Sequence, residues 1–377
     1  MESTTFFANE TERRFPMKRV GIVSTRAFSP KALEMKAQVL VQAPDVEVLL
    51  ESLDVLADDL CEKELKIVIF EAVMRLEKAG ATAVAFADDV VATFISEVQT
   101  ECRTRLVIPT VDLKEEAAAL IEAAAKPLLV KGYKIGMIGG LGPAATVDLY
   151  DKIVKATPAK NDQEHIKLVV EQNPQIPDRT AALLAGGPDP TLALFNCAKR
   201  LEDDGCDAII IPCNTAHAFI PAMERHLKIP FINMQQTTID EIKEKFGDSA
   251  RVGLMATTGT VRTGIYSKKA EAMGVPMFTP DDAHQERVMA AIYGPEGAKA
   301  GKTDGICRED LMSAAEYLVR EKDCNVLILG CTELPLILSE GPLSCAGKEV
   351  FVIDPTSALA RKVVRLALEA NKKNGVR

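Results

Sequence analysis

The sequence lacks an excess of positively charged residues. Its 45 lysines and arginines are outnumbered by 54 aspartates and glutamates, so the formal net charge at pH 7 is −9. Nucleic acids and anionic membranes are bound mainly through basic surfaces, because their phosphate groups are negatively charged. We therefore expect neither nucleic acid nor a membrane among the partners of this protein.

Long hydrophobic runs are also missing. A membrane-spanning helix needs about 20 consecutive apolar residues, and the alanine-rich run at 117–130 is interrupted by Glu122 and Lys126. The first 14 residues contain no apolar core typical of secretory signals, and their three acidic residues are atypical of a transit peptide. We expect residues 1–17 to form a tail outside the fold, and we expect a cytoplasmic protein.

Paired cysteines and clustered histidines are absent as well. None of the nine cysteines lies in a C-x-x-C pair, and nine is an odd number, so a reducing compartment fits better than a disulfide framework. Cys213 and His217 are four residues apart and could both face one side of a helix as zinc ligands. No fourth ligand is evident in a chain with only four histidines, and we therefore expect no metal.

What the chain does contain is a weak internal repeat. Residues 201–220 align without gaps on residues 76–95, and a third copy ends in Cys331. Each copy is preceded by a short apolar strand that opens the unit. These three predicted strands cover residues 19–23, 134–138 and 251–255. Because 377 residues exceed what one hydrophobic core usually organises, we expect several lobes of similar design.

Strands that alternate with helices indicate βαβ units and parallel sheets. The predicted helices include residues 66–79, 191–204 and 309–322, and further strands are expected at 106–109 and 228–232. We therefore predict an α/β fold built from repeated parallel-sheet βαβ lobes. The predicted lobes are residues 18–130, 131–250 and 251–353.

Two cysteines occupy matched positions in this repeat. Cys213 and Cys331 each follow a buried strand, and each precedes residues that favour the start of a helix. In open parallel sheets, ligands bind at the carboxyl ends of strands, where the positive end of a helix dipole favours a thiolate. A single cysteine in this setting is usually a small core residue. Two in matched repeats favour a pair of acid/base groups that face one substrate.

The first copy of the repeat differs at this position. Asp88 occupies the place of Cys213, and the Asn-Thr pair that follows the cysteine is missing. A loop carboxylate can act as a base, but the loss of the pair favours a lobe that kept the fold and lost the chemistry. We predict that the lobe at 18–130 is non-catalytic.

Four motifs together resemble a known family. Residues Pro212-Cys-Asn-Thr-Ala-His217 and Gly330-Cys-Thr-Glu-Leu334 are similar to the two catalytic cysteine motifs of the cofactor-independent aspartate/glutamate racemases. The loops at 174–180 and 298–301 resemble the aspartate racemase branch. The resemblance covers roughly residues 131–377 and, more faintly, 18–113. It implies two catalytic lobes, with the C-terminal helix at 354–377 crossing back to the first of them, a homodimer, and no cofactor.

The resemblance also implies roles for individual residues. Cys213 and Cys331 are the expected catalytic pair, and Arg179 and Lys299 are expected to bind the acidic groups of the substrate. Racemisation moves a proton off one face of a carbon and onto the other, which a thiolate and a thiol on opposite faces can do. Charge then develops on the carboxylate and requires donors that are already in place. The remaining expected substrate-binding residues are Asn214, Thr215, Thr332, Thr257, Thr258 and Gly142.

Two residues near the cysteines have open roles. His217 either tunes the thiol of Cys213 or makes a structural hydrogen bond. Glu333 either stabilises the first turn of a helix, as acidic residues there commonly do, or assists Cys331. We expect an enzyme that interconverts L- and D-aspartate, or glutamate, so that the partner is a small acidic amino acid.

Other classes of function fit the same residues. One class is a different reaction on this scaffold, such as a broad-specificity amino-acid racemase, a decarboxylase or a cis–trans isomerase. Another is a non-catalytic dicarboxylate-binding protein. The pair Arg179 and Lys299 favours an acidic amino acid, and the retention of both cysteines favours an enzyme. Residues 140–145 also match the dinucleotide-binding fingerprint, but Pro143 removes an N–H that would bind pyrophosphate.

Overall fold

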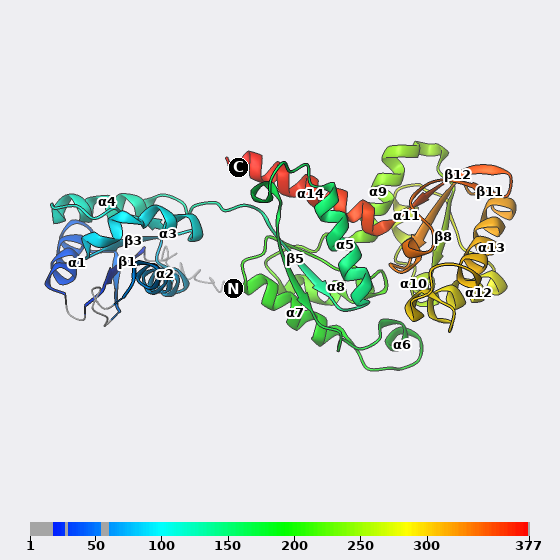
Figure 1. The fold of residues 1–377 in the computed structure, drawn as a ribbon, viewed down its shortest axis with the longest axis horizontal. Helices are drawn as coiled ribbons and strands as arrows, with labels where there is room; N and C mark the ends of the chain where they lie inside the picture. The colour runs from blue at the N-terminus through cyan, green and yellow to red at the C-terminus, as the bar shows by residue number, and fades with distance from the viewer. Residues whose placement is uncertain (1–17, 27–28, 54–59, 376–377) are drawn as a thin grey trace, which may run out of the picture. The chain divides into compact units, whose positions relative to one another are not determined.

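The computed structural model describes residues 18–26, 29–53 and 60–375, so the predicted tail at 1–17 lies outside the described residues. The chain divides into two compact units, Met1–Lys131 (unit 1) and Gly132–Arg377 (unit 2). Both units consist mainly of parallel strands connected by helices, which confirms the predicted α/β fold (Figure 1). Within the described ranges, no helix is both long and apolar enough to cross a bilayer.

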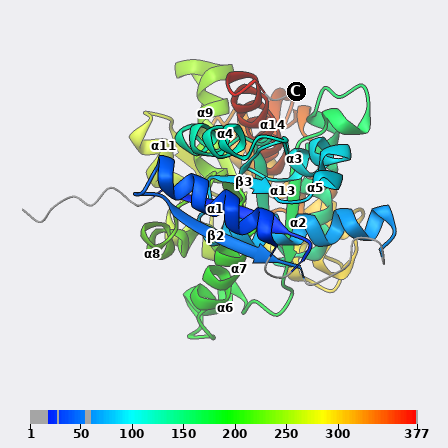
Figure 2. The same cartoon turned by 90° about the vertical axis from the view of Figure 1, so that its left-hand side faces the viewer.

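Unit 1 contains one four-stranded parallel sheet with the strand order β2-β1-β3-β4. Val20 and Ile22 of β1 point to the face covered by α1 and α4, whereas Val23 points to the face covered by α2 and α3. This alternation is the period-2 pattern of a strand buried on both faces. Figure 2 views this unit with α1 in the foreground. The elements are β1 Arg19–Ser24, α1 Pro30–Gln42, β2 Glu47–Ser52, α2 Glu62–Lys78, β3 Ala83–Phe86, α3 Ile95–Glu101, β4 Arg105–Leu106 and α4 Leu113–Ala125.

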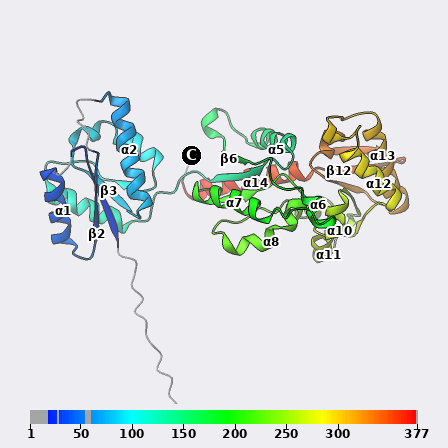
Figure 3. The same cartoon turned by 90° about the horizontal axis from the view of Figure 1, so that it is seen from below.

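Unit 2 contains two sheets, and the first one has the parallel order β6-β5-β7. We call this part the Cys213 lobe. Helices α7 and α8 cover one face of the sheet, and α5 and the C-terminal helix α14 cover the other (Figure 3). The elements are β5 Lys134–Gly139, α5 Pro143–Ala156, β6 Lys167–Gln172, α6 Arg179–Leu184, α7 Thr191–Asp203, β7 Ala208–Ile210, α8 Ile220–Met223, α9 Met234–Phe246 and α14 Pro355–Lys373.

The second sheet of unit 2 has the order β11-β12-β10-β8-β9, and we call this part the Cys331 lobe. Helices α12 and α13 cover one face, while α9 and α11 cover the other. Only β11 runs antiparallel, as a hairpin with β12. The elements are β8 Val252–Ala256, α10 Thr258–Thr263, α11 Ser267–Ala272, β9 Met277–Phe278, α12 Asp282–Tyr293, α13 Ile306–Glu321, β10 Val326–Gly330, β11 Gly341–Cys345 and β12 Lys348–Ile353.

Helix α14 follows the Cys331 lobe in sequence but packs on the Cys213 lobe. Leu359 and Val363 are fully buried against α5 and the first sheet, and each such burial contributes roughly 1.5–3 kcal/mol. Asp354 caps the first turn of α14 through the N–H of Thr356, and it also forms an ion pair with Lys152 of α5. The end of the chain therefore ties the two lobes of unit 2 together.

The predicted strands that open each repeat are present as β1, β5 and β8, and the predicted helices lie in α2, α7 and α13. Two short strands were predicted too long. The strand expected at 106–109 is reduced to β4, and the one at 228–232 is reduced to a single bridge between Phe231 and Ile209. Both segments contain a proline, Pro109 and Pro230, which has no N–H to donate to a ladder.

Candidate active site

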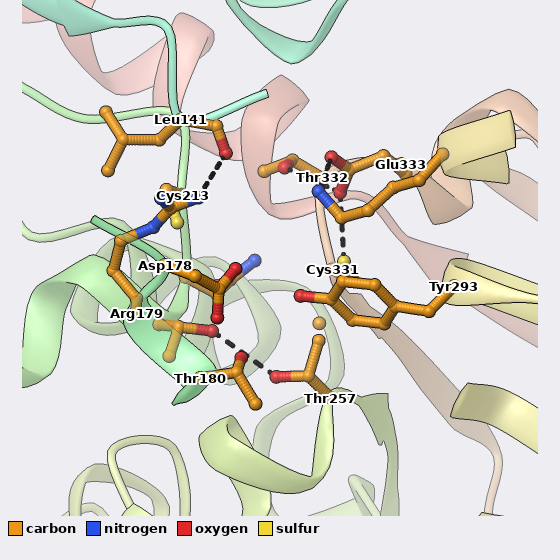
Figure 4. Close-up of a pocket in the computed structure, with 14 residues that line it drawn as sticks. Leu141, Asp178, Arg179, Thr180, Cys213, Thr257, Tyr293, Cys331, Thr332 and Glu333 are labelled. Carbon is orange, nitrogen blue, oxygen red and sulfur yellow. Dashed lines mark hydrogen bonds and ion pairs between the residues drawn. The ribbon is translucent and has the colours of Figure 1, made fainter. Parts of the chain in front are cut away.

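A pocket lies in unit 2 at the carboxyl ends of β7 and β10, where the two lobes meet (Figure 4). In this view, Cys213 and Arg179 lie on one side, and Cys331, Tyr293 and Glu333 lie on the other. The free space between them is about 20 Å³, which is room for one water molecule. The predicted residues that line the pocket are Arg179, Cys213, Asn214, Thr215, Thr257, Lys299, Cys331, Thr332 and Glu333.

Cys213 is positioned by a tight turn and by a histidine behind it. Its N–H donates to the carbonyl of Ile211 (2.8 Å), and its own carbonyl is 2.9 Å from Nδ1 of His217. The N–H of Met234 donates to Nε2 of the same ring, so we assign the proton to Nδ1. His217 does not line the pocket. Of its two predicted roles, the structural hydrogen bond fits this geometry, because both ring nitrogens bind the backbone.

Burial lowers the pKa of His217 to about 4. Since the usual value is about 6.5, the unfolded chain binds this proton more tightly than the folded chain does. The contribution of neutral His217 is therefore present above pH 6.5 and is lost as the pH falls toward 4. We expect a loss of about 3 kcal/mol in the free energy of unfolding over this window, measured by urea denaturation.

The variant His217→Gln has no group to titrate there, so its stability deficit relative to the wild type should shrink as the pH falls. Replacing the exposed His165 in the same way is the matched control. An equal pH dependence in all three proteins would contradict the assignment of a buried neutral imidazole.

The thiol of Cys331 is held in its protonated form. Burial raises its pKa well above the usual value, and the neighbouring carboxylate of Glu333 raises it further. The Sγ donates to Oε2 of Glu333 at 3.0 Å. This corrects the expectation that a helix dipole favours the thiolate. A single 3-10 turn, Leu334–Leu336, follows the cysteine, and Glu333 brings a full negative charge within hydrogen-bonding distance.

Glu333 is also bound by a cation. Burial acts to raise its pKa, but Lys299 (Nζ to Oε1, 2.7 Å) and the hydrogen bonds from Cys331 and Thr332 outweigh burial, so the pKa is lowered. Of the two predicted roles of Glu333, contact with Cys331 is the one seen. Gly142 makes room for this carboxylate, because a Cβ at position 142 would lie 2.7 Å from Oε1, and its φ of +149° is one that other residues rarely adopt.

Arg179 lines the pocket, but its guanidinium points to the backbone. Nη1 donates to the carbonyls of Ile176 (3.3 Å) and Pro177 (3.0 Å), and Nη2 donates to that of Leu141 (2.7 Å). Its buried Nε has no hydrogen-bond partner among the described residues. No carboxylate of the described chain forms an ion pair with Arg179. It is therefore a half-buried positive charge with no anion of its own.

Polar side chains from both lobes meet at the base of the pocket. The hydroxyl of Thr215 lies 3.3 Å from that of Thr257 and 3.0 Å from that of Thr260. Next to it, the side-chain nitrogen of Asn214 is buried without a partner in the described structure. Thr258 does not line the pocket; its hydroxyl accepts from Gln285 (3.4 Å) instead.

Sequence reasoning missed Tyr293, Thr180 and Leu141, which also line the pocket. The Tyr293 ring lies beneath Nζ of Lys299, 5.3 Å from the ring centroid, and burial raises the pKa of its hydroxyl. Tyr293 ends α12 just before the glycine-bearing loop at 294–301. That loop was the only signal that could have drawn attention to it, because no repeat places a tyrosine there.

The corresponding end of the sheet in unit 1 is arranged differently. The carboxylate of Asp88 accepts hydrogen bonds from the N–H (2.7 Å) and the hydroxyl (2.9 Å) of Thr25. Both of its oxygens are thus bound within unit 1. Across the described residues of the chain, no group of three or more His, Cys, Asp or Glu side chains is arranged to hold a metal ion.

Comparisons with known proteins point to one family. A family model described as Asp/Glu/Hydantoin racemase matches residues 138–363, within unit 2. The chain is 24% identical over 240 residues to the broad specificity amino-acid racemase RacX of Bacillus subtilis (strain 168), covering 61% of this chain and 96% of that protein. It is 28% identical over 169 residues to the glutamate racemase of Aquifex pyrophilus, covering 44% and 61%.

Two solved structures are similar as well. The Picrophilus torridus aspartate racemase is 33% identical with a TM-score of 0.54, and the match covers 63% of this chain and 94% of that one. An aspartate racemase homologue from Pyrococcus horikoshii OT3 is 26% identical with a TM-score of 0.51, covering 62% and 99%.

Proposed function

Because this chain belongs to the Asp/Glu/Hydantoin racemase family, we propose that it is an amino-acid racemase that interconverts L- and D-aspartate. Cys213 and Cys331 are the proposed acid/base pair. The observation that carries this proposal is the composition of one pocket: two thiols from the ends of β7 and β10, together with the side chains of Arg179 and Lys299. The 33% identity to an aspartate racemase favours aspartate over glutamate.

In the proposed reaction, one sulfur takes the α-proton and the other gives a proton back. When the first cysteine is a thiolate, the α-carbon–hydrogen bond breaks and an S–H bond forms. The electron pair passes onto the α-carboxylate, and the thiol on the opposite face then protonates the carbon. The product has inverted configuration, and the two cysteines have exchanged protonation states. The unpartnered side-chain nitrogen of Asn214 is a suitable donor to the carboxylate as its charge grows.

Because the pKa of Cys331 is raised, the two directions of racemisation begin from different protonation states of this cysteine. As a thiol, Cys331 is ready to protonate the carbanion formed by Cys213. For the opposite enantiomer Cys331 must first lose its proton, and Oε2 of Glu333, 3.0 Å away, can accept it. Glu333 thus has the proposed role of an assisting base. The negative charge that then passes to the sulfur of Cys331 is stabilised by Lys299, which acts to lower the pKa of that thiol.

Two cations, Arg179 and Lys299, and two carboxylates, Asp178 and Glu333, line the pocket. The support for an acidic substrate therefore comes from the partners of Arg179. Lys299 is balanced by Glu333, but Arg179 has only carbonyl partners in the described structure. A second substrate carboxylate would compensate this charge, and a guanidinium binds such a group bidentately. Both Nη1 and Nη2 of Arg179 donate to backbone carbonyls, so Arg179 must release at least one of these partners to bind a carboxylate bidentately.

We further propose that unit 1 is non-catalytic, because Thr25 already binds both oxygens of Asp88. The proposal of a homodimer rests on the family resemblance, and the proposal of a cytoplasmic location rests on the nine free cysteines. The substrate is a free amino acid, and no metal or cofactor has a proposed role in the proton transfers.

Incubation in D2O tests the reaction class and the substrate together. Dialysed protein, with no pyridoxal phosphate added, should incorporate deuterium at the α-carbon of L-aspartate and generate D-aspartate, as measured by mass spectrometry and chiral chromatography. L-Glutamate and L-alanine are parallel substrates, and alanine should react at least about tenfold more slowly because it lacks the second carboxylate. Equal rates for aspartate and alanine would point to a broad-specificity racemase, and no exchange with any of them would refute the proposed activity.

A further inference from the structure

The side chain of Asn214 is held from behind by two residues that do not line the pocket. Its Oδ1 accepts a hydrogen bond from the hydroxyl of Tyr266 at 2.6 Å and from Nε2 of Gln235 at 3.2 Å. Tyr266 and Gln235 are both fully buried. Gln235 belongs to the first turn of α9, whereas Tyr266 precedes α11 in the Cys331 lobe. The contact from Tyr266 therefore crosses from one lobe to the other.

These contacts determine which way the amide of Asn214 faces. Nε2 of Gln235 also donates to the backbone carbonyl of Asn214, at 3.1 Å. A carbonyl oxygen can only accept, so Gln235 must present its NH2 group to Asn214. The side-chain atom of Asn214 that meets this NH2 group must then be Oδ1. Its NH2 group is left for the opposite direction, and there it is buried without a partner in the described part of the chain.

The unpartnered nitrogen belongs to a residue that lines the pocket. Buried polar groups are nearly always hydrogen-bonded, so an exception at a pocket wall calls for a ligand. In the proposed reaction the α-carboxylate gains charge, and a fixed N–H donor is what such a group requires. If the amide turned over, Oδ1 would face the carboxylate instead and would repel it.

We propose that Tyr266 and Gln235 are positioning residues, which fix the amide of Asn214 so that Nδ2 donates to the α-carboxylate of the substrate. This inference rests on the proposed function. It adds which residues orient one of the hydrogen-bond donors to the substrate. It also gives the lobe interface a role in the chemistry. Because the hydroxyl of Tyr266 comes from the Cys331 lobe, the donor is fully oriented only when the two lobes are in contact.

The variant Tyr266→Phe keeps the buried ring and removes only the hydroxyl. We expect kcat/KM for aspartate to fall about tenfold to a hundredfold in both directions. The apparent pKa values on the acidic and alkaline sides of the pH–rate profile should stay the same, because the substitution changes neither cysteine. Tyr317→Phe is the matched control: this tyrosine stacks on His284, away from the pocket, and its loss should leave kcat/KM unchanged.

The variant Gln235→Glu tests the orientation itself while conserving size. A carboxylate cannot donate to Oδ1, so the amide of Asn214 should turn its NH2 group toward position 235 and away from the pocket. A loss of kcat/KM at least as large as that of Tyr266→Phe is expected, with a rise in KM, since binding of the carboxylate is weakened already in the ground state.

A double-mutant cycle separates positioning from general destabilisation. In an Asn214→Ala background, Tyr266→Phe should change the residual rate of α-deuterium exchange less than threefold, because there is no amide left to orient. The full loss persisting in that background would overturn the proposal, as would normal kcat/KM in both Tyr266→Phe and Gln235→Glu. Wild-type protein in the same assay reports on the proposed function: absence of exchange there refutes the racemase, whereas normal exchange in every variant refutes only the positioning role.

Discussion

Replacing Cys213 or Cys331 by alanine is expected to lower the rate of aspartate racemisation by at least about a thousandfold. In the proposed mechanism each cysteine acts on one face of the α-carbon. A variant with a single cysteine can therefore not complete the inversion. Both cysteines are almost fully buried and line the same pocket, so few other groups could take over. The measurement is the change in optical rotation, or chiral chromatography of the product.

The single variants should still exchange hydrogen in one enantiomer. With Cys213→Ala, Cys331 can still give its proton to Glu333, and the resulting thiolate can remove and return a proton on its own face. Deuterium then enters one enantiomer without inversion. Cys331→Ala should show the same behaviour with the opposite enantiomer. Exchange that favours the same enantiomer in both variants would contradict the assignment of one cysteine to each face.

Matched controls are built into the repeat. Cys206 and Cys324 each lie seven residues before an active-site cysteine, and both pack in the cores. Burial raises the pKa of each to about 11, and neither lines the pocket. Cys206→Ala and Cys324→Ala should therefore keep near-normal racemisation. Near-normal racemisation rates in Cys213→Ala or Cys331→Ala would refute the two-base mechanism.

The repeat allowed much of the architecture to be predicted. In two copies of the repeat, a polar residue follows an apolar strand at the same position. This pattern places the two polar residues at the carboxyl edges of parallel sheets. Cys213 and Cys331 follow this rule, and the loops with Arg179 and Lys299 border the same pocket. The lengths of strand β4 and of the bridge at Phe231 were harder to predict. Both segments are apolar, which favours a strand, but each contains a proline, which cannot donate a hydrogen bond to a neighbouring strand.

The ionisation of the site could not be read from the sequence. Whether Glu333 acts on its own helical turn or on Cys331 depends on its rotamer, and the rotamer depends on space left by Gly142, 191 positions earlier in the chain. The helix-start pattern after Cys331 indicated a dipole that favours the thiolate, but burial and Glu333 reverse the direction of the pKa shift. Tyr266 and Gln235 have no pattern of their own, because they contact Asn214 only in the folded structure, and Tyr266 does so across the interface between the lobes.

The variant Glu333→Gln tests this electrostatic arrangement, and we expect it to lower kcat by about a hundredfold to a thousandfold. Glutamine cannot accept the proton that Cys331 must release, and it leaves Lys299 without its anion. The direction that requires Cys331 as a base should lose more than the opposite direction. Measuring kcat separately from L- and D-aspartate reveals that difference.

The pH profile of the same variant should move in a definite direction. In the wild type, burial and the charge of Glu333 keep the pKa of Cys331 above its usual range, so the thiol form survives to high pH. Removing the negative charge lowers that pKa, although burial still acts to raise it. The alkaline limb of kcat/KM should therefore shift to lower pH, and it should do so equally for L- and D-aspartate, because their equilibrium constant of unity makes kcat/KM the same in both directions. Glu340→Gln is the control, since Glu340 pairs with Arg361 away from the pocket. If the alkaline limb of the Glu333→Gln profile stayed at the wild-type pH, Glu333 would not be the group that raises the pKa of Cys331.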